Sequence, residues 1–310
     1  MKAQQYSTYG DTSVLEFVDD HPMPKVGPGR ALVRVKAAAV NPVDWKVMAG
    51  GLDPFFDTIF PIVPGWDVAG VVEAVGAGVS GFAAGDEVMA YARDTYLHNG
   101  TFAEFVPVSV PALARKPGSL SWEEAGAMPL AGLMAYQSLR SLGVTDRGGN
   151  GKKILIHNAN GGVGAFATQL AHHFGWSVIG TASPQNHDRI HQFGAIPVAY
   201  GDGLAERILA IAPAGVDVVL DLVGGVLETT LKVLKAGGSH GSIADSTPAQ
   251  HGGKYLWVSP SGEDLTYLAG LAEHSIIQVP IAEVFPLNRL PEAFELSASH
   301  HAQGKIVVVP

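Results

Sequence analysis

The spacing of hydrophobic and polar residues changes near position 115 of this chain. Before it, short segments alternate between apolar and polar positions, as half-buried β-strands do. These segments are 31–37, 68–75, 87–91 and 101–106. Prolines and glycines separate them, so residues 1–115 are predicted to form a compact, mostly antiparallel β domain.

From Ser121 onward, apolar strands alternate with helices. Ser121 and Glu124 form a capping-box pattern that predicts the start of a helix. Strands are expected at 153–157, 177–181, 196–199, 216–221 and 239–244. Helices are expected at 163–174, after the strand at 177–181 as far as about 193, and at 226–235. This alternation indicates a doubly wound parallel sheet, with the proline-containing segment 196–199 at an edge. The last strand, 304–309, has no obvious partner there and is expected to return to the first domain.

A glycine-rich turn connects the strand at 153–157 to the helix that follows it. The turn, Ala159-Asn160-Gly161-Gly162-Val163-Gly164, has the form A-x-G-x-x-G, a variant of the dinucleotide-binding fingerprint. Gly161 and Gly162 would let backbone N–H groups approach a pyrophosphate at the positive end of the helix. Gly164 would let the helix pack closely on the strand. The sequence therefore predicts a dinucleotide cofactor.

The end of the second strand indicates which nicotinamide cofactor fits. An NAD site usually places an acidic residue about 20 positions after the turn, where it binds the ribose 2′-hydroxyl. This chain has Thr181-Ala182-Ser183 there and no carboxylate before Asp188. A hydroxyl can bond to a 2′-phosphate, and His187 and Arg189 stand nearby as cationic partners. The sequence therefore favours NADPH over NADH.

The composition excludes several classes of function. Hydrophobic residues make up 47% of the chain and charged residues 16%, as expected for a folded protein with a sizeable core. The net charge of -9 disfavours binding to nucleic acids or anionic membranes. The absence of cysteine excludes disulfides, thiol catalysis and cysteine-based zinc sites. Neither a signal-peptide pattern nor a run of about 18 apolar residues occurs, so we expect a cytoplasmic protein.

Several motifs occur in the order typical of one family. They are Ala39-Val40-Asn41-Pro42-Val43-Asp44-Trp45-Lys46, Pro64-Gly65-Trp66-Asp67-Val68-Ala69-Gly70, Gly85-Asp86-Glu87-Val88, Asn160-Gly161-Gly162-Val163-Gly164, Asp221-Leu222-Val223-Gly224-Gly225 and Gly304-Lys305-Ile306-Val307. Through them the chain resembles the zinc-free quinone oxidoreductase branch of the medium-chain dehydrogenase/reductase superfamily along nearly its whole length. The resemblance implies an α/β protein with a GroES-like catalytic β domain at 1–115 and 281–310 and a Rossmann NADP-binding domain at 116–280.

The resemblance also bears on metal binding. Zinc-containing members of the superfamily place a cysteine where this chain has Asn41, and a His-Glu pair where it has Trp66-Asp67. No ligand set remains, so we expect an enzyme without zinc and without Lewis-acid catalysis by a metal. His187 and His191, spaced i, i+4, have no evident third ligand beside them and do not change this expectation.

By position, the resemblance adds residues to the cofactor site. Ser183 and Tyr200 match positions that contact the 2′-phosphate, and Asn41 matches a position beside the nicotinamide ribose. Segments near the nicotinamide are matched by Met134, Val223, Gly224, Ile243, Ala244, Trp257 and Val258. With the residues already derived, the predicted cofactor-binding set also includes Asn160, Gly161, Gly162, Val163, Gly164, His187 and Arg189.

The expected reaction follows from the absence of a metal. A hydride from NADPH can pass to an acceptor already polarised by conjugation, such as a quinone or an α,β-unsaturated carbonyl compound, while the protein orients the reactants and excludes water. Asn41 would hydrogen-bond the acceptor oxygen or the ribose, Asp44 would stabilise that geometry and Lys46 would donate to an anion. Tyr96 or water is the candidate proton donor.

Two other functions share these motifs. An enoyl-thioester or alkenal reductase of the same superfamily would use the same residues. A non-catalytic NADPH-binding redox sensor would carry the same cofactor motifs but would not turn over. The expected partners are a small-molecule substrate and, by resemblance, a second copy of the chain in a homodimer, with neither nucleic acid nor membrane.

Overall fold

The computed structural model describes residues 1–299 and 301–310, and its contacts divide the chain into two compact units. Unit 1 comprises Met1–Leu133, Pro260–Ser275 and Val279–Pro310, and unit 2 comprises Met134–Ser259 and Ile276–Gln278. Residues 116–133 and 260–275 thus group with the first unit, because α2 (Trp122–Ala127) packs on the sheet of unit 1 and α8 (Gly262–Glu273) packs on β9 (Leu113–Arg115). The sequence-based domain boundaries stay a prediction.

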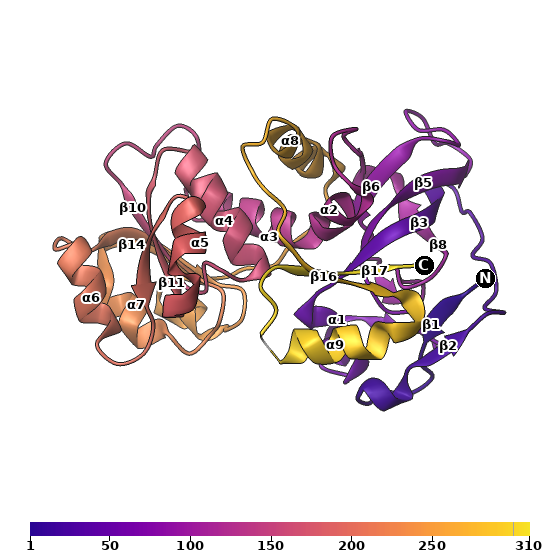
Figure 1. Cartoon of the computed structure of the whole chain (residues 1–310), viewed down its shortest axis with the longest axis horizontal. Coiled ribbons are helices and arrows are strands. Elements are labelled where there is room, and N and C mark those ends of the chain that lie inside the picture. The colour runs from indigo at the N-terminus through magenta and orange to yellow at the C-terminus, as the bar shows by residue number, and fades with distance from the viewer. Residues whose placement is uncertain (300) are drawn as a thin grey trace. The chain divides into compact units, whose positions relative to one another are not determined.

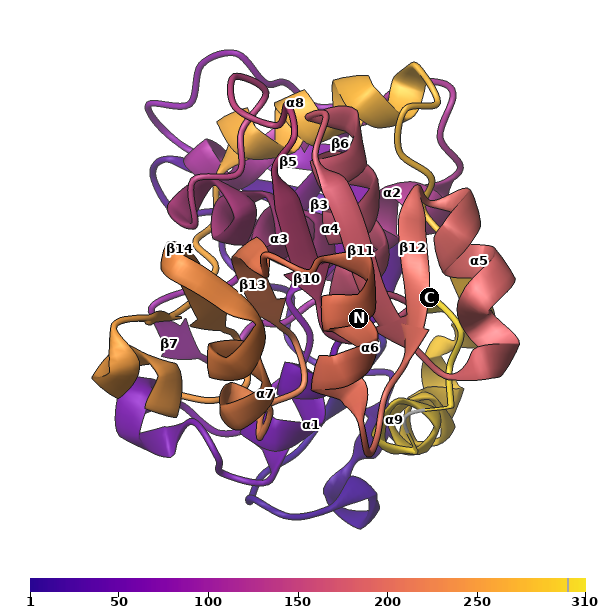
Figure 2. The ribbon, with the colours of Figure 1, turned by 90° about the vertical axis from the view of Figure 1, so that its left-hand side faces the viewer.

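Unit 2 is built on a sheet of six parallel strands, ordered β12-β11-β10-β13-β14-β15 (Figure 2). The strands are β10 (Lys153–Ile156), β11 (Ser177–Ala182), β12 (Ala195–Ala199), β13 (Val216–Asp221), β14 (Leu234–Ser242) and β15 (Lys254–Tyr255). The first three strands, β10 to β12, are added on one side of β10, and the next three, β13 to β15, on its other side. This strand order is that of a dinucleotide-binding Rossmann sheet. The predicted doubly wound sheet, with β12 at an edge, is confirmed.

Helices cover both faces of this sheet. They are α4 (Gly162–His173), α5 (His187–Gln192), α6 (Leu204–Ile211) and α7 (Leu227–Val233), with α4 and α5 on one side of the strands and α6 and α7 on the other (Figure 1). Leu155, Ile179 and Val219 on neighbouring strands form one buried cluster with Ile208 of α6 and Val233 of α7. Apolar residues on successive strands therefore hold the sheet and its helices together.

The sheet of unit 1 follows the order β16-β17-β3-β5-β6-β9, with β8 also paired to β3. Its remaining strands are β3 (Arg30–Val40), β5 (Asp67–Val75), β6 (Glu87–Tyr91), β8 (Phe105–Ser109), β16 (Ile281–Pro286) and β17 (Lys305–Val309). All pairs except β16 with β17 are antiparallel. This agrees with the predicted mostly antiparallel domain.

Smaller elements complete the fold. The short strand pairs are β1 (Ala3–Gln5) with β2 (Glu16–Val18) and β4 (Asp57–Thr58) with β7 (Tyr96–Leu97). The other helices are α1 (Pro42–Met48), α3 (Pro129–Ser141) and α9 (Leu290–Ala298). Short 3₁₀ turns lie at Thr12–Val14, Asp53–Phe55, Val110–Ala112, Pro184–Asn186, Thr247–His251 and Leu287–Arg289.

The C-terminal strand β17 pairs antiparallel with β3, where Val307 lies opposite Ala39. The expectation that the tail returns to the first part of the chain is confirmed. This return places Lys305, the first residue of β17, beside the end of β3, where the motif beginning at Ala39 leaves the sheet.

Two predicted strands have different limits in the structure. The segment 101–106 is not one strand, because the N–H groups of Thr101 and Phe102 donate to the carbonyls of Gly65 and Pro64, and pairing with β3 starts only at Phe105. Alternation in the sequence could not reveal this loop contact. The strand expected at 239–244 begins earlier, at Leu234, because β14 pairs with β13 on both sides of a bulge.

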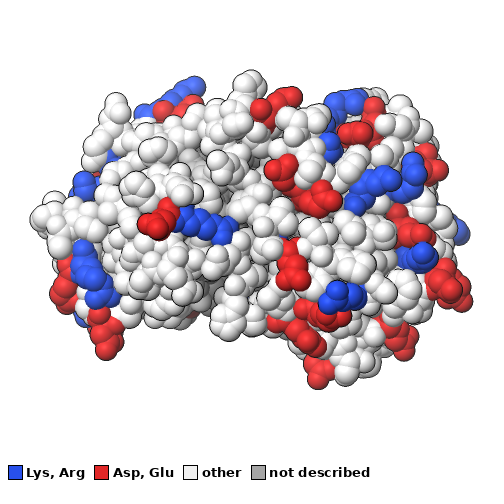
Figure 3. All heavy atoms as spheres, viewed as in Figure 1, with Lys and Arg blue, Asp and Glu red and all other residues white. Residues whose placement is uncertain are grey.

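The charged surface is mixed. On the face drawn in Figure 3, Lys and Arg side chains lie next to Asp and Glu side chains, so that face offers no extended basic area to a polyanion. Within the described ranges, no helix combines the length and apolar character that a membrane span requires.

Candidate active site

Asn41 lies where β3 ends and α1 begins. Its backbone is extended, and Pro42 occupies the first helical position, where the missing N–H is not needed. The N–H of Asn41 donates to Oδ2 of Asp44 at 2.7 Å, so the third residue of the helix holds Asn41, the residue that precedes the helix. The strand-to-helix junction therefore fixes Asn41 and Asp44 relative to each other.

The side-chain amide of Asn41 is enclosed by protein groups. It is 2% exposed, and its Nδ2 donates to Oδ2 of Asp67 at 2.8 Å and to the carbonyl oxygen of Ala39 at 3.3 Å. Its Oδ1 accepts a hydrogen bond from Nζ of Lys305. Because an ammonium can only donate, this contact decides which end of the amide is oxygen. Both amide hydrogens are used inside the protein.

Asp67 and Lys305 form a buried ion pair next to this amide. Asp67, at the start of β5, is fully buried, and its Oδ1 accepts from the N–H of Leu130 at 2.7 Å. Its Oδ2 lies 3.7 Å from Nζ of Lys305. Lys305 is 4% exposed and also donates to the carbonyl oxygen of Val40 at 3.1 Å. We call Asn41, Asp67 and Lys305 the buried triad.

The charge of this one ammonium acts on two buried carboxyl groups, on Asp67 in the ion pair and on Asp44 from farther away. Burial raises the pKa of Asp67 to about 6, although Lys305 and the hydrogen bonds from Asn41 and Leu130 favour the carboxylate. Burial raises the pKa of Asp44 to about 8, against the hydrogen bond from Asn41 and with a further rise from Asp67. Burial lowers the pKa of Lys305, and both aspartates oppose that change. These shifts favour the carboxylate at Asp67 and the carboxylic acid at Asp44.

A small cavity of about 20 Å³, enough for one water molecule, lies beside Asp44. Its lining includes Asp44, Gly65, Trp66, Tyr96 and His98. Two of the four predicted catalytic residues, Asp44 and Tyr96, therefore meet at one cavity. Of the other two, Asn41 does not line the cavity, and Lys46 is exposed with its ammonium 5.4 Å from the Trp45 ring centre.

In unit 2, the glycine-rich turn leads from β10 into α4 with Gly161 as the N-cap. A Cβ on Gly164 would lie 2.1 Å from the carbonyl oxygen of Asn158, so only glycine allows the helix to start this close to the strand. The first N–H groups of α4 have no partner within the helix. Oδ1 of Asn160 is buried without a hydrogen-bond partner, which suits a hydroxyl donor such as a ribose. The turn thus fits a dinucleotide.

Three of the residues predicted around the 2′-phosphate, Ser183, His187 and Arg189, follow β11, and Tyr200 follows β12. Ser183 is half-buried and its Oγ accepts from Nδ2 of Asn186 at 2.9 Å. His187 begins α5 with Nε2 3.4 Å from the carbonyl oxygen of Ala182. Arg189 is half-buried on the same helix, 5.7 Å from the ring centre of Phe193, whereas Tyr200 is 64% exposed.

The remaining predicted cofactor residues follow three other strands. Val223-Gly224, Ile243-Ala244 and Trp257-Val258 come after β13, β14 and β15, so they lie at the carboxyl edge of the sheet, where ligands of this fold bind. The N–H groups of Val223 and Gly224 both donate to Oδ1 of Asp221, at 2.8 and 2.9 Å. Met134 lies half-buried on α3.

Sequence reasoning assigned no role to Asp67 or Lys305. A signal was available, because each is a charged residue that opens an almost wholly apolar strand, Asp67 before Val68-Ala69 and Lys305 before Ile306-Val307-Val308-Val309. Charged residues at such positions are buried only when they are paired. The partner, however, is more than two hundred positions away in the chain.

The donor atoms do not fit a zinc site. The oxygens of Asn41 and Asp67 are bound to the ammonium of Lys305, and the neighbouring Trp66 offers no metal ligand. Elsewhere in the described part of the chain, no three His, Cys, Asp or Glu side chains converge to hold a metal.

Comparison with known proteins identifies the family. The alcohol dehydrogenase GroES-like domain family matches residues 27–118, and the zinc-binding dehydrogenase family matches residues 194–308. The second name refers to a family that contains zinc enzymes, whereas the donor atoms described above are those of this chain.

Full-length relatives agree with these matches. The chloroplast envelope quinone oxidoreductase homolog of Arabidopsis thaliana is 32% identical, over 100% of this chain and 98% of its own length. The NADPH-dependent alkenal/one oxidoreductase of the same plant is 35% identical, over 100% of this chain and 80% of its own. The Escherichia coli quinone oxidoreductase crystallised with NADPH superposes with a TM-score of 0.87 at 26% identity, covering 100% of both chains. The chain belongs to the medium-chain dehydrogenase/reductase superfamily and is an enzyme of its quinone oxidoreductase-like kind.

Proposed function

We propose that this enzyme transfers a hydride from NADPH to a quinone or an α,β-unsaturated carbonyl compound without a metal ion. One observation carries the proposal: the oxygens of Asn41 and Asp67 are bound to the ammonium of Lys305. With those oxygens occupied, an acceptor has to be electron-poor through its own conjugation. The names of the Arabidopsis relatives, a quinone oxidoreductase homolog and an alkenal/one oxidoreductase, point to the same acceptors.

The cofactor proposal rests on the chemistry at the ends of β10 and β11. When bound, NADPH supplies the hydride. The N-terminus of α4 would bind its pyrophosphate, and Oδ1 of Asn160 would accept from a hydroxyl. Ser183, His187 and Arg189 offer a hydroxyl, an imidazole and a guanidinium to the 2′-phosphate. Tyr200 stays in this set as a prediction, as do the residues assigned beside the nicotinamide.

Asp44 is the proposed proton source. After hydride addition, a conjugated acceptor carries negative charge and needs a proton. Asp44 holds one at neutral pH, because burial keeps it neutral beside the ionised Asp67. The cavity that it shares with Tyr96 is large enough for one water molecule, which would relay the proton. Asn41 is then a positioning group, and the second lone pair of its Oδ1 would accept a hydrogen bond from the ribose. Lys46 stays a predicted donor to an anion.

Two alternative functions remain as proposals. An alkenal or enoyl-thioester reductase differs only in the acceptor, and the name of the 35% identical relative favours the alkenal. A non-catalytic NADPH sensor would need no buried acid beside a cavity, so the geometry at Asp44 favours an enzyme. The homodimer and the cytoplasmic location remain predictions.

Turnover tests the proposal as a whole. We expect the purified protein to oxidise NADPH faster than NADH in the presence of quinones and enones, followed by the loss of cofactor absorbance. Prior incubation with a strong chelator should leave the rate unchanged, because no step uses a metal. Binding of NADPH with no oxidation by any acceptor of a broad panel would instead identify a sensor, and loss of rate with the chelator would contradict the metal-free reaction.

A carboxylate at position 183 tests the choice of cofactor. Ser183→Asp should raise the KM for NADPH and shift the preference towards NADH, because an acidic group repels a 2′-phosphate and binds a 2′-hydroxyl. Gln185→Asp is the matched control, since it adds the same charge at an exposed position two residues away. Steady-state kinetics with both cofactors decides. Equal effects of the two substitutions would mean that Ser183 does not face the phosphate.

Asp44→Asn tests the proton source. The rate with an enone should fall by about 10²–10⁴-fold, the usual contribution of a general acid, because an amide supplies no acidic proton. The pKa of Asp44 is raised in the folded state, so this group weakens the wild type as the pH rises from about 4 towards 8. The variant lacks that effect, so its free energy of unfolding relative to wild type should be higher at about pH 8 than at about pH 5.

The exposed Asp57 provides the control, since Asp57→Asn should change neither the rate nor the pH dependence of stability. Urea unfolding at both pH values and enone reduction give the two readouts. An Asp44→Asn rate within twofold of wild type would remove Asp44 from the mechanism.

A further inference from the structure

Lys305 is a buried charge that the proposed reaction does not use directly. It is 4% exposed, and the three residues that follow it on β17, Ile306, Val307 and Val308, are also buried. Taking an ammonium out of water costs several kcal/mol unless other groups replace its hydration. An apolar residue would cost less free energy at this end of an apolar strand, so packing alone does not account for a lysine here.

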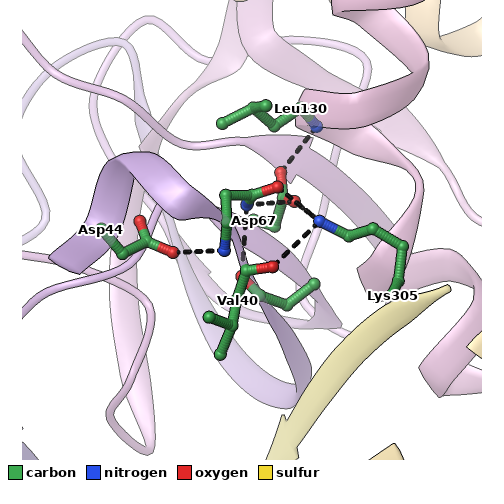
Figure 4. Close-up of polar contacts among 7 residues, drawn as sticks. Val40, Asp44, Asp67, Leu130 and Lys305 are labelled. Atoms are coloured by element: carbon green, nitrogen blue, oxygen red, sulfur yellow. Dashed lines mark hydrogen bonds and ion pairs between the residues drawn. The ribbon is translucent and has the colours of Figure 1, made fainter. Parts of the chain in front are cut away.

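The ammonium of Lys305 lies among three oxygens, from the last residue of β3, from the N-cap of α1 and from the first residue of β5. Nζ donates to the carbonyl oxygen of Val40 at 3.1 Å and to Oδ1 of Asn41, and it lies 3.7 Å from Oδ2 of Asp67 (Figure 4). Val40 ends β3, and Asp67 begins β5. Convergence of oxygens on one point is how proteins hold a cation, and here the cation belongs to the chain itself.

The ammonium orients the Asn41 amide. With Oδ1 held by Lys305, Nδ2 must face Asp67 and Ala39, and the amide cannot turn over without placing two donors against each other. The backbone of Asn41 in turn donates to Asp44. The position of the proposed acid is therefore connected to Lys305 through one residue.

The ammonium also keeps Asp67 ionised, and Asp67 holds the start of α3. Oδ1 of Asp67 accepts from the N–H of Leu130, at the positive end of that helix, where a carboxylate binds better than a carboxylic acid. Met134 follows Leu130 by one helical turn on the same face. The charge on Asp67 thus stabilises the start of α3, the helix that contains Met134, a residue predicted to lie near the nicotinamide.

We infer that Lys305 is a positioning residue of this enzyme, an internal cation that orients Asn41 and Asp67 and occupies the oxygens a metal ion would need. The inference rests on the proposed function for its kinetic consequence. Its structural part, the orientation of the Asn41 amide, can be measured on the protein without any substrate.

Lys305→Met keeps the apolar stem and removes the charge. Substitution of a residue that orients an active-site group typically costs about 10–100-fold in activity, and we expect a fall of that size in kcat. The KM for NADPH should change less than kcat, because the phosphate contacts proposed for the cofactor lie in unit 2 and Asn41 would contact only the ribose. The side-chain amide hydrogens of Asn41, followed by NMR, should exchange with solvent faster than in wild type.

A double variant separates orientation from charge balance. Lys305→Met alone leaves Asp67 buried without its cation and should lower stability, whereas Lys305→Met with Asp67→Asn leaves no charge and should recover much of it. If Lys305 positions Asn41, the stable double variant keeps the low kcat and the fast amide exchange. If its kcat returns to that of wild type, Lys305 only balances a charge and the inference is overturned.

Lys235→Met is the matched control, because Lys235 also forms an ion pair, with Asp217 at 2.9 Å, but in unit 2 and only half-buried. It should leave kcat and the exchange of the Asn41 amide unchanged. Failure of the wild type to oxidise NADPH with any acceptor would refute the proposed function alone. Unchanged amide exchange in a folded Lys305→Met protein would refute the inference alone.

Discussion

The buried ion pair between Lys305 and Asp67 is the interaction on which the candidate active site depends. A charge on either residue is tolerable only with the other present, and together they enclose the amide of Asn41. The pair joins the last strand of the chain to the beginning of β5. The return of the C-terminus to unit 1 therefore does more than complete a sheet, because it delivers the cation that the site requires.

A single cation for two carboxyl groups gives the two aspartates different roles. The negative charge is favoured on Asp67, because Asp67 accepts hydrogen bonds from Leu130 and Asn41 and forms the ion pair with Lys305. The raised pKa of Asp44 favours its neutral form, beside a cavity large enough for one water molecule. The cofactor site proposed in unit 2 would rely instead on backbone N–H groups at the start of α4 rather than on buried side-chain charges.

The fold and the cofactor turn could be predicted from the sequence because both depend on local patterns. The alternation after Ser121 gave the Rossmann sheet, and the spacing of Gly161 and Gly164 gave the turn. The triad could not be predicted in this way, because Lys305 and Asn41 are 264 positions apart and meet only through strand pairing. For the same reason, the sequence could not show that both amide hydrogens of Asn41, which was expected to hydrogen-bond the acceptor oxygen or the ribose, are bound within the protein.

Neutron diffraction from crystals at about pH 7 would locate the protons that give Lys305, Asp44 and Asp67 their roles. We expect three deuterium atoms on Nζ of Lys305, directed at the oxygens of Val40, Asn41 and Asp67. We also expect a deuterium on the carboxyl group of Asp44 and none on that of Asp67. A metal ion bound between Asn41 and Asp67, or a neutral Lys305 beside a protonated Asp67, would contradict these roles.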